Sequence, residues 1–440
     1  MHHSNSNSDF DFSSVLSDQL LLRVFSKLPI SDHLSTSLVC KRWLFLHGRL
    51  VQSLKLLDWQ FLESGRLFAR FPRLTEIDTV TSSCIRLAPN SGVLLTVKPS
   101  SFFSLPISSS STTHDDDLSS VVDPDRILQL IAQKYPNLRR IAVLGASEYG
   151  LATLSDTCRT LQELELHSCG DLSLKGVSGC VNLQVMKLTA AARRMMDGLN
   201  FNSSSSSVVV SDIGLTILAQ NCKRLVKLEL CGCEGSYDGV KAIGECCQML
   251  EELTFQDHRM DAGWLAALSF CANLKTLRLR SCKSIDSDPG LDEHLGVCPM
   301  LQELHLERCH LRDMKSTKSL FLVCAHVQDI VLRNCWGFHD DLFAFASLCR
   351  RVKLLYLEHC SLLTTGGLES VLLSWKCLQR LMVVSCSKIK DNEVTPELAS
   401  LFSVLKELKW RPDTRSLLSA DLEGIGMWRK GGKFFTSLKG

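Results

Sequence analysis

The nonapeptide LQELHLERC, residues 301–309, sets the pattern that most of this chain follows. It reads apolar-x-x-apolar-x-apolar-x-x-Cys. Its alternating leucines predict a short strand whose leucines point inward and whose intervening side chains lie on the opposite face. Six further segments repeat the pattern closely: LQELELHSC (161–169), LVKLELCGC (225–233), LKTLRLRSC (274–282), VQDIVLRNC (327–335), VKLLYLEHC (352–360) and LQRLMVVSC (378–386).

Looser copies begin at Leu138, Leu183, Leu250 and Leu405, and from residue 250 onward successive copies start 24 to 27 residues apart. This period is typical of leucine-rich repeats, in which a strand and a helix form each turn of a solenoid. The segment SDIGLTILAQNCKRL (211–225) predicts such a helix, capped by Ser211 or Asp212. We expect its inner stripe to consist of Ile213, Leu215, Leu218, Ala219 and Cys222.

The cysteines follow the same register. Seven occupy the ninth position of a repeat and eight precede a repeat by three residues, so 15 of the 20 cysteines are in register. Cysteine is small and apolar enough to be buried, which favours a packing role. Metal binding is the alternative, but the close pairs Cys231/Cys233 and Cys246/Cys247 lack a second pair at the spacing of a zinc site.

Over about residues 131–412 the pattern resembles the cysteine-containing subclass of leucine-rich repeats. The resemblance implies an α/β fold: a right-handed horseshoe solenoid with parallel strands on the concave face and helices on the convex face. We expect degenerate first repeats over 55–130, with a Ser-rich loop at 100–120, and an insertion at 189–210. Residues 1–13 are expected to be disordered, and 413–440 to cap the last repeat.

Residues 14–54 precede the repeats and are unusually apolar. Ser17 can cap a helix that carries Leu16, Leu20, Val24 and Leu28 at a spacing of four and that ends at Pro29. A module of about forty residues buries only part of such a surface. The remainder either packs on the first repeats as a cap or forms a docking face for another protein.

The stretch LSDQLLLRVFSKLPISDHLSTSLVCKRW (16–43) resembles an F-box, with Ser17 where the family usually has proline. Together with the repeats, it resembles the leucine-rich-repeat class of F-box proteins, which includes plant hormone receptors. The resemblance implies three short helices that dock on the Skp adaptor of a cullin-based ubiquitin ligase. The residues expected to contact the adaptor are Leu16, Leu20, Leu21, Val24, Phe25, Leu28, Pro29, Leu34, Val39, Cys40 and Trp43.

The implied function is that of a substrate-recognition subunit. The F-box would bind the Skp adaptor and, through it, a cullin and a RING subunit, while the repeats would capture a target protein for ubiquitination. The chain would itself catalyse nothing and would act by proximity. The alternatives are a repeat scaffold whose N-terminal helices are only a cap, or a small-molecule-sensing receptor outside a ubiquitin ligase. No cofactor is expected.

Target specificity should depend on the concave positions and on the loops that follow the strands. Arginines and large apolar side chains gather there in the later repeats, and these dominate binding hot spots. An acidic or phosphorylated segment would suit the arginines. The alternative is an ordinary solvated face with charges of both signs. The residues expected to contact a target are Arg278, Arg280, Arg308, Arg333, Tyr356, Met382 and Arg411.

Charge and hydropathy exclude other classes of partner. The net charge is +2, from 49 basic and 47 acidic residues, so no basic field favours nucleic acid or an anionic membrane. No apolar run approaches the roughly 18 residues of a membrane span. The start MHHSNSNSDFDF lacks the pattern of a secretory signal, so we expect a cytoplasmic or nuclear protein.

Overall fold

The computed structural model describes residues 15–29, 32–56, 59–80, 95–96, 123–190, 209–291, 295–412, 427–430 and 433–436. The chain divides into two compact units, Met1–Leu144 and Gly145–Gly440. The expected disordered residues 1–13 and Ser-rich loop 100–120 lie outside the described residues, as does most of the insertion 189–210. In none of the described parts is a helix both long and apolar enough to span a bilayer.

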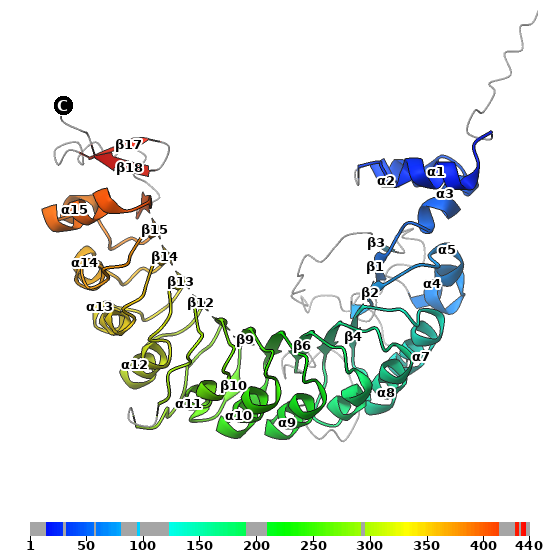
Figure 1. The fold of residues 1–440 in the computed structure, drawn as a ribbon, viewed down its shortest axis with the longest axis horizontal. Coiled ribbons are helices and arrows are strands. Elements are labelled where there is room, and N and C mark those ends of the chain that lie inside the picture. The colour runs from blue at the N-terminus through cyan, green and yellow to red at the C-terminus, as the bar shows by residue number, and fades with distance from the viewer. Residues whose placement is uncertain are drawn as a thin grey trace, which may run out of the picture. The chain divides into compact units, whose positions relative to one another are not determined.

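The first unit starts with three short helices and continues as strands and helices in alternation (Figure 1). Strands β1 and β2 pair in parallel, β2 pairs in parallel with β4, and β3 pairs antiparallel to β1. The elements are α1 (Asp18–Phe25), α2 (His33–Leu38), α3 (Lys41–Gly48), β1 (Ser53–Leu56), α4 (Trp59–Glu63), α5 (Arg66–Arg70), β2 (Glu76–Asp78), β3 (Leu95–Thr96), α7 (Pro124–Lys134) and β4 (Arg140–Leu144).

The second unit repeats one turn many times: a five-residue strand, a tight turn and a helix. Its main strands pair in parallel in the order β16-β15-β14-β13-β12-β11-β9-β7-β6-β5. They are β5 (Glu163–His167), β6 (Val185–Thr189), β7 (Lys227–Cys231), β9 (Glu252–Gln256), β11 (Thr276–Arg280), β12 (Glu303–Glu307), β13 (Asp329–Arg333), β14 (Leu354–Glu358), β15 (Arg380–Val384) and β16 (Glu407–Arg411).

Helices cover one face of this sheet, and the strands line the inner side of its curve (Figure 1). The helical elements are α8 (Glu148–Thr157), η3 (Ser173–Gly179), α9 (Asp212–Asn221), α10 (Tyr237–Cys246), α11 (Trp264–Ala267), η4 (Leu268–Phe270), α12 (Met314–Val323), α13 (Asp340–Phe343), η6 (Ala344–Leu348), α14 (Thr365–Leu372), η7 (Asp391–Glu393) and α15 (Pro396–Val404). The α/β fold with parallel strands is therefore confirmed.

Two small pairs complete the second unit. Strands β8 (Glu234–Gly235) and β10 (Arg259–Met260) pair in parallel in the turns after β7 and β9. Strands β17 (Met427–Lys430) and β18 (Lys433–Thr436) form an antiparallel hairpin, and β18 lies next to β16 and α15. The rest of the expected cap, 413–440, lies outside the described residues, and its capping role stays a prediction.

The core follows the leucine alternation. In β12 the side chains of Leu304 and Leu306 are fully buried, whereas the residues between and beside them are partly exposed. The eighth residue of most repeats has a positive φ, which ends the strand and turns the chain toward the next helix. The non-glycine residues in this conformation are Ser168, Asp257, Ser281, Arg308, Asn334, His359 and Ser385.

One predicted helix face is partly wrong. Helix α9 begins after Ser211, whose hydroxyl accepts a hydrogen bond from the amide of Ile213 at 3.3 Å, as the cap prediction required. However, Ile213 is 66% exposed, while Leu215, Leu218, Ala219 and Cys222 are buried as predicted. The neighbouring Gly214 lies on the inner side of the helix instead. Only glycine fits there, because a Cβ at this position would collide with the Asp171 carboxylate of the preceding repeat.

Candidate functional site

Helices α1, α2 and α3 form a module with a core of its own. Leu21, Phe25 and Leu46 are buried at its centre, and the ring of Trp43 lies 4.8 Å from that of Phe25. Leu22, Leu28 and Leu50 pack partly against this cluster. The module therefore stabilises itself with one side of its apolar sequence.

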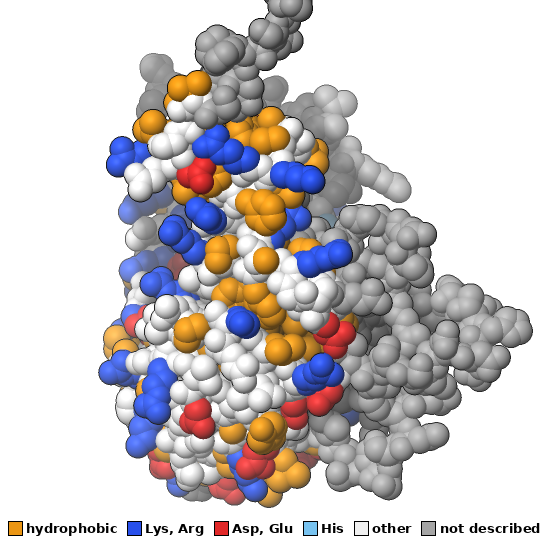
Figure 2. Space-filling view, turned by 90° about the vertical axis from the view of Figure 1, so that its right-hand side faces the viewer, with side chains coloured by type: hydrophobic (Ala, Val, Ile, Leu, Met, Phe, Trp, Pro, Cys, Tyr) orange, Lys and Arg blue, Asp and Glu red, His pale blue; other side chains and the backbone are white. Residues whose placement is uncertain are grey.

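The other side of that sequence is exposed. Leu20 and Val24, one turn apart on α1, are 47% and 52% exposed, and Leu16 and Val39 are also exposed. In the space-filling view, exposed hydrophobic side chains lie between basic ones at the upper end of the molecule (Figure 2). An exposed apolar face with a filled core beneath it is the property expected of a docking surface.

The structure places the eleven predicted adaptor-contact residues in different environments. Leu16, Leu20, Val24, Pro29, Val39 and Cys40 are exposed; Leu28 and Trp43 are partly buried; Leu21 and Phe25 belong to the core. Leu34 lies in α2, but its side chain is outside the described part. Direct adaptor contact by these residues stays a prediction.

Sequence reasoning missed two exposed apolar residues, Leu38 at the end of α2 and Phe45 in α3. Both lie in the segment LVCKRWLF (38–45), which is more apolar than so small a module can bury. Phe45 follows Trp43 by two residues, so the two rings leave the helix in different directions, and only Trp43 reaches the core. We define the exposed ridge as Leu16, Leu20, Val24, Leu38, Val39 and Phe45.

Polar contacts hold the ridge helices together. Arg42 pairs with the Asp18 carboxylate at 2.7 Å and donates to the backbone oxygen of Leu16 at 2.6 Å, which joins α3 to the start of α1. Cys40 caps α3, its sulfur accepting from the amide of Trp43 at 3.4 Å, and Ser17 caps α1 in the predicted way. Residues 15–50 carry a surplus of three positive charges, from Arg23, Lys27, Lys41, Arg42 and Arg49 against Asp18 and Asp32.

The second surface is the inner face of the sheet, where cross-strand register arranges side chains in columns. The middle column runs Glu229, Thr254, Arg278, His305, Val331, Tyr356, Met382, Lys409. The outer column, nearer the strand ends, runs Gln256, Arg280, Glu307, Arg333, Glu358, Val384, Arg411. Six of the seven predicted target-contact residues therefore lie in these two columns, and the seventh, Arg308, follows the end of β12.

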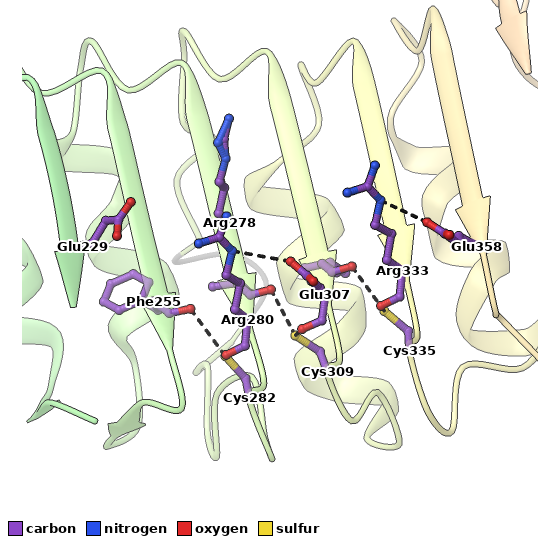
Figure 3. Close-up of polar contacts among 12 residues, drawn as sticks. Glu229, Phe255, Arg278, Arg280, Cys282, Glu307, Cys309, Arg333, Cys335 and Glu358 are labelled. Carbon is purple, nitrogen blue, oxygen red and sulfur yellow. Dashed lines mark hydrogen bonds and ion pairs between the residues drawn. The ribbon is translucent and has the colours of Figure 1, made fainter. Parts of the chain in front are cut away.

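Three of the predicted arginines already have acidic partners. Arg280 lies 3.5 Å from the Glu307 carboxylate, and Arg333 lies 3.3 Å from that of Glu358 (Figure 3). Arg278 lies between two carboxylates on neighbouring strands, those of Glu303 and Glu252, at 3.7 and 4.0 Å. By contrast, Arg308 and Arg411 are exposed and have no ion-pair partner among the described residues.

Tyr356 and Met382 are adjacent in the middle column and partly exposed. The Tyr356 hydroxyl donates to Glu358 at 3.0 Å, and the Arg333 guanidinium lies 4.8 Å from the centre of its ring. Burial and the nearby Glu358 carboxylate raise the pKa of Tyr356, so its hydroxyl remains a donor at neutral pH. The inner face between β13 and β16 thus combines apolar area with fixed polar groups.

All fifteen register cysteines are buried. Several thiols donate to a backbone oxygen of the preceding repeat: Cys282 to Phe255 at 3.9 Å, Cys309 to Leu279 at 3.2 Å and Cys335 to Leu306 at 3.5 Å (Figure 3). These carbonyls lie within the paired strands of the sheet, so each thiol adds a second donor, which an alanine would not provide. Nowhere in the described residues do three or more His, Cys, Asp or Glu side chains cluster as metal ligands.

Comparison with known proteins identifies an F-box domain at residues 13–46. The chain is 25% identical to human F-box/LRR-repeat protein 12 over 73% of this chain and 95% of the relative. It is 23% identical to a Transport inhibitor response 1-like protein of rice, Oryza sativa subsp. japonica, over 77% of this chain but only 64% of that protein. Among solved structures, the leucine-rich repeat-containing protein LegL7 of Legionella pneumophila matches 81% of this chain and 98% of its own, with 12% identity and a TM-score of 0.41.

Proposed function

We propose that this chain, an N-terminal F-box followed by leucine-rich repeats, is the substrate-recognition subunit of a Skp-cullin-F-box ubiquitin ligase. An F-box implies binding to a Skp-type adaptor, and both relatives named above are similar over most of this chain. The observation that supports the proposal most is the exposed ridge of α1, α2 and α3 above a core that is already filled. A ridge that served only to close the module would be buried.

In this role the chain carries out no bond chemistry. The adaptor would link it to the cullin and RING subunits, and the repeats would hold a target within reach of a ubiquitin-charged enzyme. Its contribution to rate is proximity, because an encounter between two proteins becomes an encounter within one complex. We place this complex in the cytoplasm or nucleus, and the free thiols of all the described cysteines suit such a reducing compartment.

We propose the inner face of the repeats, with the loops that follow its strands, as the target surface. Arg308, Tyr356, Met382 and Arg411 have accessible groups there. The other three arginines already pair with a carboxylate of this chain and would have to exchange it for one of the target: Arg278, Arg280 and Arg333. Their net contribution to the free energy of target binding should therefore be smaller.

Reconstitution with a purified Skp-type adaptor tests the proposal. The intact chain should form a stable complex with the adaptor, whereas a chain lacking residues 1–54 should not bind it. The far-ultraviolet circular dichroism of the shortened chain controls for folding of the repeats. Failure of the intact chain to bind the adaptor would support the scaffold alternative instead.

A second measurement tests target capture separately. The adaptor, cullin and RING subunits would be assembled with the intact chain, and with the double variant Arg280→Glu and Arg333→Glu. Proteins retained by the intact chain and ubiquitinated only in its presence would be candidate targets. We expect the double variant to retain adaptor binding and to lose these targets.

A further inference from the structure

Trp336 is 47% exposed, whereas Trp43 and Trp59 are partly buried and Trp264, Trp375 and Trp410 are buried. It is the first residue after the register cysteine Cys335, at the carboxyl end of β13. Other repeats carry Gly170, Ser361 or Ser387 at this position. The repeat therefore folds without a large side chain here, and packing does not explain Trp336.

The structure holds Trp336 in one place. Its amide donates to the backbone oxygen of Cys309 at 2.9 Å, and its own backbone oxygen accepts from the amide of Leu311 at 2.8 Å. Its ring lies 4.9 Å from the ring of His310 on the neighbouring repeat. A large aromatic side chain that is exposed and already ordered loses little conformational entropy on binding, which favours a hot spot.

Two arginines without partners flank this position. Arg308 and Arg312 are exposed, and the ion pairs of the described residues include neither of them. Arg308 adopts a left-handed conformation with φ of 55°, where other repeats carry the smaller Ser281 or Ser385. The conformation is shared by the eighth residue of most repeats, so what distinguishes Arg308 is its long, charged side chain.

Arg312 lies against the turn that contains Trp336. A Cβ added to Gly337 would come within 2.5 Å of the Arg312 Cγ and within 3.4 Å of its Nε, and Gly337 has a φ of +78°. Glycine at 337 therefore leaves room for the arginine beside the tryptophan. The closest acidic residue in sequence, Asp313, accepts from the amide of Ser316 at 2.6 Å as the cap of α12.

We propose that Arg308, His310, Arg312 and Trp336, the rim cluster that follows the carboxyl ends of β12 and β13, bind an acidic segment of the target protein. An apolar side chain of the segment packs on the Trp336 ring, and its carboxylates pair with the Arg308 and Arg312 guanidinium groups. This assignment rests on the proposed function, since it specifies what the repeats capture. The two rim arginines differ from the inner-face arginines Arg280 and Arg333, whose charges are offset by carboxylates within the sheet.

Defined peptides test the proposal with the full chain. The probe is a fluorescein-labelled Glu-Glu-Leu-Phe-Glu-Glu, and fluorescence anisotropy measures its binding. The comparison peptides replace the glutamates with glutamines, replace Leu-Phe with Gly-Gly, or replace the four glutamates with phosphoserines. We expect the glutamate peptide to bind at least about fivefold more tightly than the glutamine and glycine peptides, and less tightly when salt is raised.

The rim variant combines Trp336→Ser, Arg308→Ser and Arg312→Gln, of which the two serines occur naturally at these repeat positions. It should bind the glutamate peptide about tenfold more weakly than the wild type. The control variant combines Tyr149→Ser, Arg350→Gln and Arg351→Gln, which removes one exposed aromatic residue and two exposed arginines elsewhere on the repeats. It should bind within about twofold of the wild type.

Equal binding of the glutamate and glutamine peptides, equal binding by the rim variant and the wild type, or binding of the phosphoserine peptide alone would each overturn the proposal. Adaptor binding by the same preparations separates the two ideas. Adaptor binding without rim-dependent peptide binding contradicts the rim cluster alone. Rim-dependent peptide binding without adaptor binding contradicts the ubiquitin-ligase role and supports the rim cluster as a surface of the repeats.

Discussion

Replacing Leu20 and Val24 together with glutamine should abolish tight adaptor binding without unfolding the module. Both side chains are on the exposed side of α1, where they are 47% and 52% exposed. Glutamine favours a helix about as well as leucine and better than valine. Surface substitutions of this kind change the free energy of unfolding by about 0.5 kcal/mol or less.

The loss of affinity follows from the area that binding would bury. Full burial of a leucine or valine side chain contributes roughly 1.5–3 kcal/mol, and about half of each of these side chains remains to be covered. We therefore expect a loss of about 2 kcal/mol for the pair, which corresponds to a roughly 30-fold increase in Kd. Isothermal titration calorimetry with a purified Skp-type adaptor measures this change.

The neighbouring Phe25 provides the matched control, because it is only 1% exposed and belongs to the core of the same module. Phe25→Ala should lower the free energy of unfolding by about 3–5 kcal/mol and lose adaptor binding by unfolding the module. Thermal unfolding therefore distinguishes the two variants, because only Phe25→Ala should destabilise the module. If the double glutamine variant stays folded and binds the adaptor within threefold of the wild type, the exposed ridge is not the docking surface.

Three other measurements follow from the described contacts. Burial lowers the pKa of His258 to about 4, below its unfolded value near 6.5, so the neutral side chain is fully compatible with the fold above pH 6.5 and stability is lost as the pH falls toward 4. Between pH 7 and pH 4.5 the wild type should therefore lose up to ~3 kcal/mol more of its free energy of unfolding than His258→Asn does, as urea unfolding at the two pH values would measure. Among the described cysteines, the exposed Cys40 and Cys377 should react with a thiol reagent before unfolding and the register cysteines only after it, as peptide mass spectrometry would show. Glu307→Gln, which removes the partner of Arg280, should lower the free energy of unfolding by less than about 1 kcal/mol, and the difference should shrink in 1 M salt.

The sequence predicts the repeats well because each repeat states the same pattern again. The leucine alternation and the register cysteines predict strands such as β12, and Ser17 and Ser211 cap the helices for which they were proposed. The inward face of α1 was not predictable in the same way. Leu16, Leu20, Leu21, Val24 and Phe25 make that helix apolar around most of its circumference, so periodicity alone does not say which side is core.

The sequence pattern also does not show which acidic residues form ion pairs with the inner-face arginines. Arg280 and Glu307 are 27 residues apart, and only the parallel register of β11 with β12 brings them together. Ile213 shows the same limit, since its exposure depends on how closely the Asp171 carboxylate approaches the backbone of Gly214. The ion pairs and the exposure of Ile213 both depend on distances between repeats, which a pattern within one repeat does not contain.

Two of the side-chain hydrogen bonds described for the repeats have their donor in the later repeat and their acceptor in the earlier one. The Cys309 thiol donates a hydrogen bond to a carbonyl of the repeat before it. The Asp212 carboxylate accepts a hydrogen bond from the hydroxyl of Ser236 in the repeat after it. Such a turn is therefore completed by the turn that is synthesised next. In a chain emerging from the ribosome, the last turn made would lack the hydrogen-bond donors of the next repeat until that repeat is synthesised. A truncated product would expose that same turn, with a buried carbonyl and a capping carboxylate left without donors, and would be open to quality control from its C-terminal end.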